Sequence, residues 1–311
     1  MAEQAIQRVA ITGVLGNLGG KLIRYLAEQP AYTRLVGLDL RAPTFDDLAD
    51  IQQHVQHSAE ITLQACDLTD WHDRRWRDVV AGVDAVVHFA AQNPFPEASW
   101  TDAAVTYAMT LNLARAAADS RVRRFVFASS NHVMGRYKDD PLASQIGPGE
   151  LTTDLEPGVG TIWHTGVQLM DSTTYAVPRV ATEWLLKATA AQTDGRLKGV
   201  CVRIGWCQPG ENHPRTLNAA GTPTLEHKAA ADDPDMARAD RWYKGMWLSN
   251  RDFAHLFDRA LQADSTHWPG PFIIVNGNSN NTGMQWSQRE AREYLGYDPQ
   301  DNVFAPEYQQ P

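Results

Sequence analysis

The sequence predicts an α/β protein built on a doubly wound parallel sheet, with a smaller C-terminal lobe. Two observations support this fold class. Short apolar runs alternate along the chain with longer stretches of helical periodicity. These runs also lack the in-and-out alternation of half-exposed strands, so both faces of the expected sheet must be covered. Because parallel strands are joined by right-handed crossovers, the intervening helices fall on the two faces.

The expected strands begin near the N-terminus and continue into the last part of the chain. They span residues 8–12, 34–39, 60–66, 84–90, 123–130, 198–204 and 272–277. Helical spacing is clearest in residues 17–27, 103–119 and 180–192. We predict a first domain over residues 1–204 and a smaller lobe, facing the substrate, over residues 205–311. Residues 138–172 and 208–240 are predicted as long inserted loops, of the kind that often cover a functional site.

The turn after the first strand carries three spaced glycines in the stretch TGVLGNLGG. Gly13 allows a tight turn, Gly16 lets the backbone approach a pyrophosphate, and Gly19 lets the helix pack closely on the strand. The free N–H groups that open this helix favour an anion at the same point. Asp39 ends the second strand, where its carboxylate can accept hydrogen bonds from both ribose hydroxyls and would repel a 2′-phosphate. Together these features predict a Rossmann domain that binds NAD rather than NADP.

Other strand ends supply further candidate cofactor contacts. Asp67 suits the adenine amino group, and Ala90 and Ala91 are small where the backbone must pass the cofactor. Arg41 softens the preference for NAD, because a cation there can meet a 2′-phosphate. The cofactor-binding residues predicted from this pattern are Gly13, Leu15, Gly16, Asn17, Leu18, Gly19, Asp39, Leu40, Arg41, Asp67, Leu68, Phe89, Ala90, Ala91 and Ile204.

Composition argues against several classes of partner. The net charge of −9 disfavours nucleic acid and anionic membranes, which both reward a basic surface. No apolar run reaches the roughly 18 residues that a membrane span needs. Cys66, Cys201 and Cys207 form no CxxC pair, so we expect a reducing, cytoplasmic setting. Histidines and acidic residues show no metal-site spacing, and we predict no metal.

A series of motifs runs in order along nearly the whole chain: TGVLGNLGG, LDLR, CDLTD, HFAA, SSNHVMG, TYAVPR, VRIG and MWLSNRDF. Through these motifs the chain resembles the extended short-chain dehydrogenase/reductase superfamily, of the NAD-dependent epimerase/dehydratase type. Within it, the stretches SSNHVMGRY, WLSNRDFAHLFDRAL and VNGNSNNTGMQWSQREAREYLGYDPQDN are similar to uronate dehydrogenases and aldose C1-dehydrogenases. The two predicted inserts depart from the compact pattern of that branch.

The resemblance implies three catalytic residues. Ser130 corresponds to the serine that hydrogen-bonds the reacting oxygen, and Tyr175 to the tyrosine that exchanges its proton. Arg179 stands in place of the lysine that binds the nicotinamide ribose and stabilises the phenolate. Tyr175 and Arg179 are therefore also expected to contact the cofactor.

The resemblance also implies a sugar-binding set. Asn131 and His132 match residues that hold the sugar in uronate dehydrogenases, and Arg241 lies one residue out of register with a carboxylate-binding arginine. The implied substrate-binding residues are Gln92, Asn93, Ser130, Asn131, His132 and Arg241. His164, with Trp163, is considered as a lid over the substrate site, but this is not the favoured interpretation. Trp242, Tyr243 and Trp247 suit core packing better than stacking on a sugar.

The surroundings of Tyr175 depart from the superfamily pattern at three positions. Arginine keeps the positive charge that stabilises a phenolate, but it cannot relay a proton and its planar fork points differently. Pro178 predicts that the helix begins near Val177, with Tyr175 at its extreme N-terminus. Thr106 stands about where the superfamily has an asparagine in its proton relay. These changes indicate either retuned chemistry or its loss.

Three functions therefore remain open. The first is an NAD-dependent oxidoreductase that oxidises C1 of a uronate or aldose to a lactone. The second is a sugar epimerase or dehydratase that keeps its NAD bound, and the third is an NAD-binding sensor without turnover. The expected partner of the enzyme is a small sugar-like substrate. The resemblance further implies a homodimer formed through the helices at 103–119 and 180–192.

Overall fold

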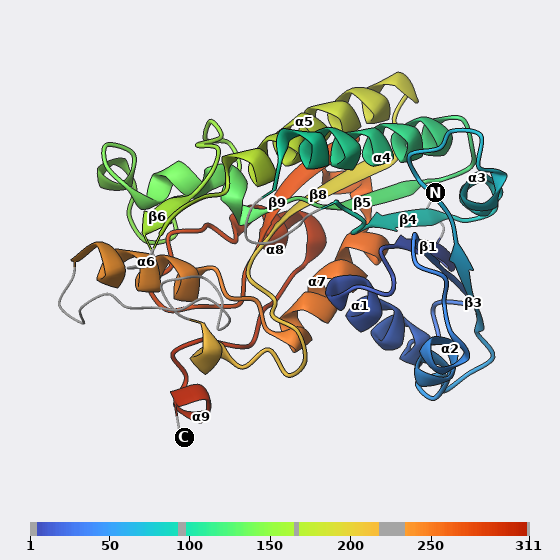
Figure 1. The fold of residues 1–311 in the computed structure, drawn as a ribbon, viewed down its shortest axis with the longest axis horizontal. Helices are drawn as coiled ribbons and strands as arrows, with labels where there is room; N and C mark the ends of the chain where they lie inside the picture. Colours follow the sequence, from blue (N-terminus) through green and yellow to red (C-terminus); the bar gives the residue numbers. More distant parts are fainter. Residues whose placement is uncertain (1–4, 93–97, 165–167, 218–233, 310–311) are drawn as a thin grey trace.

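The computed structural model describes residues 5–92, 98–164, 168–217 and 234–309. Its centre is a sheet of seven parallel strands in the order β3-β2-β1-β4-β5-β8-β9 (Figure 1). This arrangement confirms the predicted doubly wound α/β fold. The strands are β1 (Arg8–Thr12), β2 (Arg34–Asp39), β3 (Glu60–Ala65), β4 (Ala85–His88), β5 (Arg124–Ala128), β8 (Lys198–Ile204) and β9 (Phe272–Gly277).

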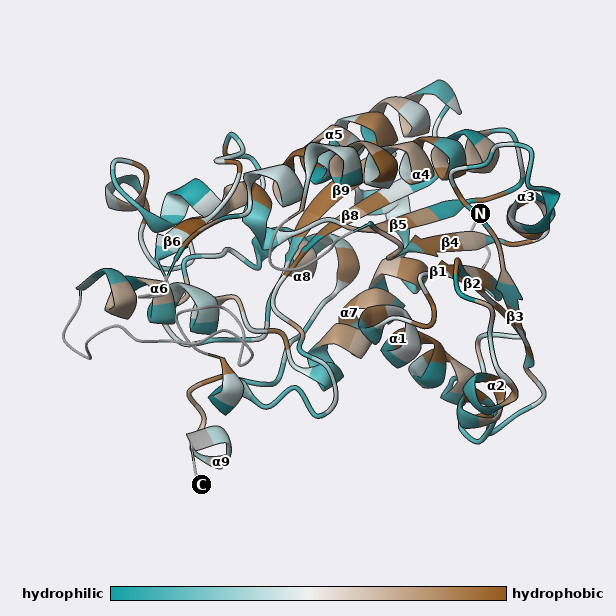
Figure 2. Ribbon diagram, in the orientation of Figure 1, coloured by the Kyte–Doolittle hydropathy of each residue, from teal (hydrophilic) through white to brown (hydrophobic). Residues whose placement is uncertain are grey.

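Helices cover both faces of this sheet. One layer contains α1 (Asn17–Glu28), α7 (Asn250–Gln262) and α8 (Arg289–Leu295), and the other contains α3 (Arg74–Ala81), α4 (Trp100–Ala118) and α5 (Thr173–Gln192). Alternate residues of β1 serve the two cores: Val9 and Ile11 face the first layer, and Ala10 faces the second. Figure 2 shows β8 and β9 as largely hydrophobic, as expected for strands buried on both sides.

A second lobe lies beyond the carboxyl ends of the strands. It contains the 3₁₀ helices η1 (Asn131–Lys138) and η2 (Ala143–Gln145), the antiparallel pair β6 (Ile162–His164) and β7 (Leu169–Asp171), and α6 (Pro234–Gly245) (Figure 1). Its own core includes Met134, Trp163 and Trp242. The short elements η3 (Pro214–Thr216), α9 (Pro306–Gln309), η4 (Ser265–His267) and α2 (Phe45–Gln52) complete the described helices.

The two predicted inserts contain regular structure. Residues 138–172 include η2 and the β6–β7 pair, because Trp163 and Met170 anchor those strands in the core of the second lobe. Residues 234–240 of the other insert open α6, whereas residues 218–233 lie outside the described part of the chain. The lobe boundary at residue 204 stays a prediction. Beyond it, β9 and α7 belong to the main sheet and its helical layer.

The start of α5 differs from the sequence expectation. The helix begins at Thr173, not near Val177, and Pro178 lies inside it. Proline removes the one N–H that would bond to the carbonyl of Thr174. Burial of the Pro178 ring and of Arg179 offsets this loss, so the helix continues through it. Tyr175 therefore sits within the first turn of α5.

Candidate active site

A cavity of about 720 Å³ opens where the carboxyl ends of β1, β4, β5 and β8 meet. The strand order reverses between β1 and β4, and open α/β sheets bind ligands at such a switch point. The cavity is lined by Gly16, Asn17, Leu18, Phe89, Ala91, Ala98, Ala128, Ser129, Ser130, Asn131, His132, Trp163, Asp171, Ser172, Tyr175, Arg179, Ile204, Gly205, Trp206, Cys207, Gln208, Pro209 and Met246.

The glycine turn has the geometry of a phosphate cradle. Gly13 has a φ of +66°, and a Cβ atom there would come within 2.9 Å of the Ala90 nitrogen. A Cβ atom on Gly19 would lie 2.3 Å from the Gly13 oxygen, so this position excludes any side chain. Gly16 caps α1 without a side-chain hydrogen bond, which leaves the first N–H groups of the helix to an anion. The turn fits the pyrophosphate of a dinucleotide.

The end of β2 supports the same ligand. Asp39 accepts hydrogen bonds from the backbone N–H of Leu15 at 2.9 Å and of Arg41 at 3.1 Å. A carboxylate offers about four acceptor sites, so lone pairs remain for ribose hydroxyls. The Arg41 guanidinium is held by both oxygens of Asp47, at 3.0 and 3.1 Å. Asp47 also belongs to the capping box that starts α2. The Arg41 guanidinium is therefore already paired with a carboxylate in this structure.

Ser130 and Asn131 begin the segment that follows β5. Ser130 is buried, and its hydroxyl oxygen accepts a hydrogen bond from the backbone N–H of His132 at 3.1 Å. That bond leaves the hydroxyl hydrogen for another acceptor. Asn131 is 1% exposed, yet neither its amide nitrogen nor its oxygen has a partner in the described part of the chain. Because a buried amide without partners costs free energy, this side chain is suited to a ligand in the cavity.

Tyr175 and Arg179 lie one turn apart on α5 and are stacked. The guanidinium carbon of Arg179 is 3.4 Å from the centroid of the Tyr175 ring, and its Nη1 donates to the Tyr175 carbonyl oxygen at 2.5 Å. Burial lowers the pKa of Arg179, while Tyr175 opposes that shift. A guanidinium remains charged at neutral pH under such a shift, so a buried cation lies against the face of the phenol.

His132 is the centre of an aromatic wall at the substrate end of the cavity. Its ring stacks on Trp163 and meets Trp206 edge-on, with centroids 6.4 and 6.3 Å away. Nδ1 lies 2.8 Å from the Thr161 hydroxyl and 3.0 Å from that of Ser172. Burial, together with the charge of Arg179, lowers the pKa of His132 to about 4. His132 is therefore neutral at physiological pH.

The structure gathers only part of the predicted site around this cavity. Predicted residues that line it are Gly16, Asn17, Leu18, Phe89, Ala91, Ser130, Asn131, His132, Tyr175, Arg179 and Ile204. Gly13, Leu15, Gly19, Asp39 and Ala90 build the turn beneath it. Leu40 and Arg41 are exposed, Leu68 is buried, and the Asp67 carboxylate accepts from the N–H and hydroxyl of Thr69.

Two predicted substrate residues do not line this cavity, and a third cannot be placed. Arg241 on α6 lines another cavity together with Lys138 and Arg238, so the structure does not bring it to the site. The backbone of Gln92 is tied to the Thr106 hydroxyl by two hydrogen bonds of 3.0 Å. Asn93 lies outside the described residues.

The sequence reasoning missed two residues between β8 and the second predicted insert. Trp206 and Cys207 line the cavity, and their position directly after a strand was the available signal. Burial raises the pKa of the Cys207 thiol to about 11, so it stays protonated and unreactive. On the inserted segment, Trp163 reaches the cavity, while His164 is exposed and does not line it. Trp242, Tyr243 and Trp247 are core residues, as predicted.

Among the described residues, no group of three or more His, Cys, Asp or Glu side chains is placed to hold a metal ion. None of the helices that the structure describes is long and apolar enough to cross a membrane. The fold and the cavity together define a dinucleotide-binding protein with a serine, a tyrosine and a buried cation beside the cofactor position.

The chain belongs to the NAD dependent epimerase/dehydratase family, whose model matches residues 9–271. An NAD-dependent glucose-6-phosphate dehydrogenase of Haloferax volcanii is 31% identical, and the match covers 95% of this chain and 94% of that protein. An L-arabinose 1-dehydrogenase (NAD(P)(+)) of the same organism is 28% identical, with 95% and 97% covered. A solved structure titled mutated uronate dehydrogenase is 24% identical with a TM-score of 0.64, covering 96% of this chain and 82% of that one. The family membership establishes NAD as the cofactor, and the glycine turn and Asp39 fit it.

Proposed function

We propose that this protein is an NAD-dependent dehydrogenase that oxidises the C1 hydroxyl of a sugar, an aldose or a uronate, to a lactone. One observation carries the proposal: Ser130, Tyr175 and Arg179 line the same cavity as the glycine turn Gly16–Leu18. The names of the relatives support it, since they include an aldose 1-dehydrogenase and uronate dehydrogenases.

The residues divide the proton chemistry between them. Tyr175 accepts the proton of the C1 hydroxyl, and the hydroxyl of Ser130 donates to the same substrate oxygen. Arg179 lies over the face of the Tyr175 ring, where its charge favours the phenolate. Bound NAD supplies the acceptor for the hydride that leaves C1. Arg179 thus performs electrostatically the part for which related enzymes use lysine.

The substrate end of the cavity suits a sugar ring. Trp163, Trp206 and His132 offer ring faces and edges for the apolar side of a pyranose. Asn131 supplies one amide donor and one acceptor for sugar hydroxyls, because both ends of its amide lack protein partners in the described residues. Neutral His132 adds a hydrogen-bonding group without a charge.

The test is NADH formation by the purified protein with NAD and a panel of sugars. The panel should contain galacturonate, glucuronate, L-arabinose, glucose and glucose 6-phosphate. Stoichiometric NADH and lactone from one of these substrates supports the proposal and identifies the substrate. NAD-dependent change of a sugar without net NADH would instead assign an epimerase or dehydratase. NAD binding without any conversion across the panel would favour the sensor.

We further propose that the protein is a homodimer formed through α4 and α5. These helices pack together and expose Trp100, Leu111, Val177 and Trp184 on the outside of the molecule. Large apolar side chains gathered on adjacent helices favour burial against a second copy. Light scattering should give twice the chain mass, and Trp184→Glu with Leu111→Glu should give a monomer. A wild-type monomer at micromolar concentration would contradict the proposal. The cytoplasmic setting also remains a proposal, supported by three free thiols.

A further inference from the structure

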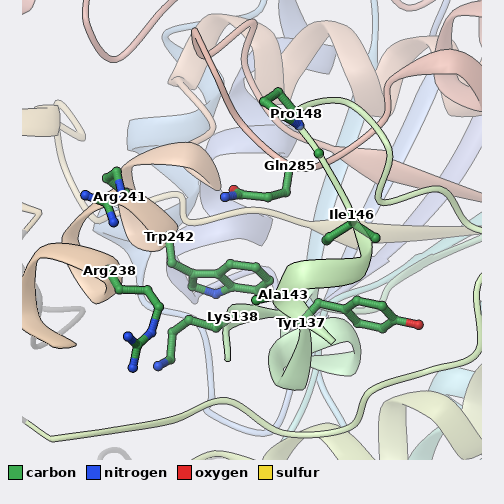
Figure 3. A pocket seen from close by; sticks show the side chains of 10 residues that line it. Tyr137, Lys138, Ala143, Ile146, Pro148, Arg238, Arg241, Trp242 and Gln285 are labelled. Carbon is green, nitrogen blue, oxygen red and sulfur yellow. The ribbon is translucent and has the colours of Figure 1, made fainter. Parts of the chain in front are cut away.

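A second, smaller cavity lies behind the active site, in the second lobe. Its volume is about 190 Å³, and it shares no lining residue with the active-site cavity. Figure 3 shows the polar side chains around it: Tyr137 and Lys138 at the end of η1, Arg238, Arg241 and Trp242 on α6, and Gln285 between β9 and α8. Ile146 and Pro148 form an apolar side. Nothing in the proposed reaction uses this cavity.

The residues that line this cavity carry only positive charge. Its lining contains three cationic residues and no carboxylate. From outside the lining, Asp139 accepts from Lys138 at 2.7 Å and from Arg238 at 2.9 Å. Asp235 accepts from Arg238 at 2.8 Å. These two carboxylates offset two of the three positive charges.

Arg241 is the cation that remains. It is exposed, and the described part of the chain gives it neither an ion pair nor a hydrogen bond. The nearest further carboxylate along the lining segment, Glu150, accepts from the backbone N–H of Gly147 at 2.6 Å. A planar guanidinium with five N–H donors is therefore available at one wall.

An independent observation points to the same ligand chemistry. Trp242 is 2% exposed, yet its indole N–H has no acceptor among the described residues. The indole nitrogen is a donor only, so its partner must supply an acceptor oxygen. Lys138 is likewise buried and donates to a single carboxylate. The cavity thus combines several unused donors with an unbalanced positive charge.

We propose that this cavity binds a small oxyanion, a phosphate or carboxylate group on a compact molecule, at a site separate from the active site. Arg241 supplies the charge, and Trp242 donates one hydrogen bond to an oxygen of the ligand. Ile146 and Pro148 contact the apolar part of the molecule. Because η1 begins at Asn131 and ends at Lys138, a ligand here also rests on the segment that lines the active site.

The test is calorimetric titration of inorganic phosphate, and separately of acetate, into the protein at constant ionic strength. The protein is saturated with NAD, so that the glycine turn is occupied and cannot take the anion. We expect one site with a Kd of about 1 mM for the preferred anion. Arg241→Gln should weaken binding about tenfold, since it removes a charged hydrogen-bonding partner from an exposed position. Phosphate and acetate distinguish the two sources of the oxyanion.

Two variants make the result decisive. Arg74→Gln is the matched control, because Arg74 is 81% exposed and pairs with Asp78 on α3, far along the sequence from this lobe; it should bind as the wild type does. Trp242→Phe keeps an aromatic ring and removes only the indole donor, and it should weaken binding severalfold. Wild-type affinity in Arg241→Gln, or no binding of either anion to the wild type, would overturn the proposal.

Discussion

The cofactor half and the substrate half of one cavity are built in different ways. The cofactor half comes from a short continuous segment, β1–α1–β2, in which Gly13, Gly19 and Asp39 fix the turn. The substrate half is assembled from η1, the β6–β7 pair, α5 and the loop after β8. The backbone geometry of the glycine turn restricts which residues the cofactor half can contain, so this half is recognisable in the sequence. The substrate half depends on packing between segments that are distant in the sequence, so it is harder to recognise there. In the proposed function, the chemistry takes place where the two halves meet, at Tyr175.

The largest expected effect is at this meeting point. Tyr175→Phe removes the base and keeps the ring that stacks on Arg179, so kcat should fall by about 10² to 10⁴-fold. NAD affinity should change little, which a direct binding titration checks beside the NADH assay. Tyr294→Phe on α8 is the matched control, and it should retain full activity. Substantial activity in Tyr175→Phe would assign the base to another residue.

The second-largest expected effect comes from a substitution that disrupts only the cofactor half of the cavity. A Cβ atom on Gly19 meets the Gly13 oxygen at 2.3 Å, so Gly19→Ala should lower the free energy of unfolding by about 3 kcal/mol. NAD binding should weaken by about a hundredfold, because the turn must open. Its neighbour Gly20 is the control, since there a Cβ atom meets only the flexible end of Arg24. Gly20→Ala should be neutral or slightly stabilising. Equal effects in the two variants would contradict the role of Gly19 in the phosphate-binding turn.

Acid should destabilise the fold through two buried neutral histidines, His88 at the end of β4 and His132 in η1. Burial lowers the pKa of His88 to about 3 and that of His132 to about 4. An unfolded histidine binds its proton near pH 6.5, so below that pH the unfolded state holds more protons and folding loses stability. At pH 5 each residue should cost about 2 kcal/mol relative to pH 7. Urea unfolding at both pH values should show this loss, and His132→Gln should reduce it by one histidine's share.

The smallest effect would sharpen the role of Arg179. Arg179→Lys keeps the charge but loses the planar stacking on Tyr175 and the bond to its carbonyl. Activity should therefore fall by about tenfold, with NAD binding retained. Arg179→Gln, which also removes the charge, should lose more. Full or increased activity in Arg179→Lys would mean that arginine is merely a tolerated cation here.

The sequence predicted most of the sheet, and it did so for a physical reason. Buried parallel strands are continuous apolar runs, and β1, β2, β8 and β9 match the expected spans residue for residue. The glycine turn was equally readable, because φ and steric exclusion leave no alternative to glycine at Gly13 and Gly19.

The substrate side was less readable, because its contacts are not local. Trp163 stacks on His132 from a pair of strands inside a segment that looked like a loop. Arg241 looked like a substrate ligand from its position near the WLS motif, but it lies on α6 at another cavity. Pro178 predicted a later helix start, although one missing N–H was not enough to end α5.

The ion pair between Arg41 and Asp47 decides whether the Arg41 guanidinium is available at the edge of the cofactor site. Arg41 follows the strand that carries Asp39, and Asp47 holds its guanidinium while capping α2. Loss of the Asp47 carboxylate would free the two N–H groups that Arg41 now donates to it, two residues from Asp39, and an arginine near that position can meet a 2′-phosphate. A descendant of this protein could therefore broaden its coenzyme choice through a helix cap, leaving the end of β2 unchanged.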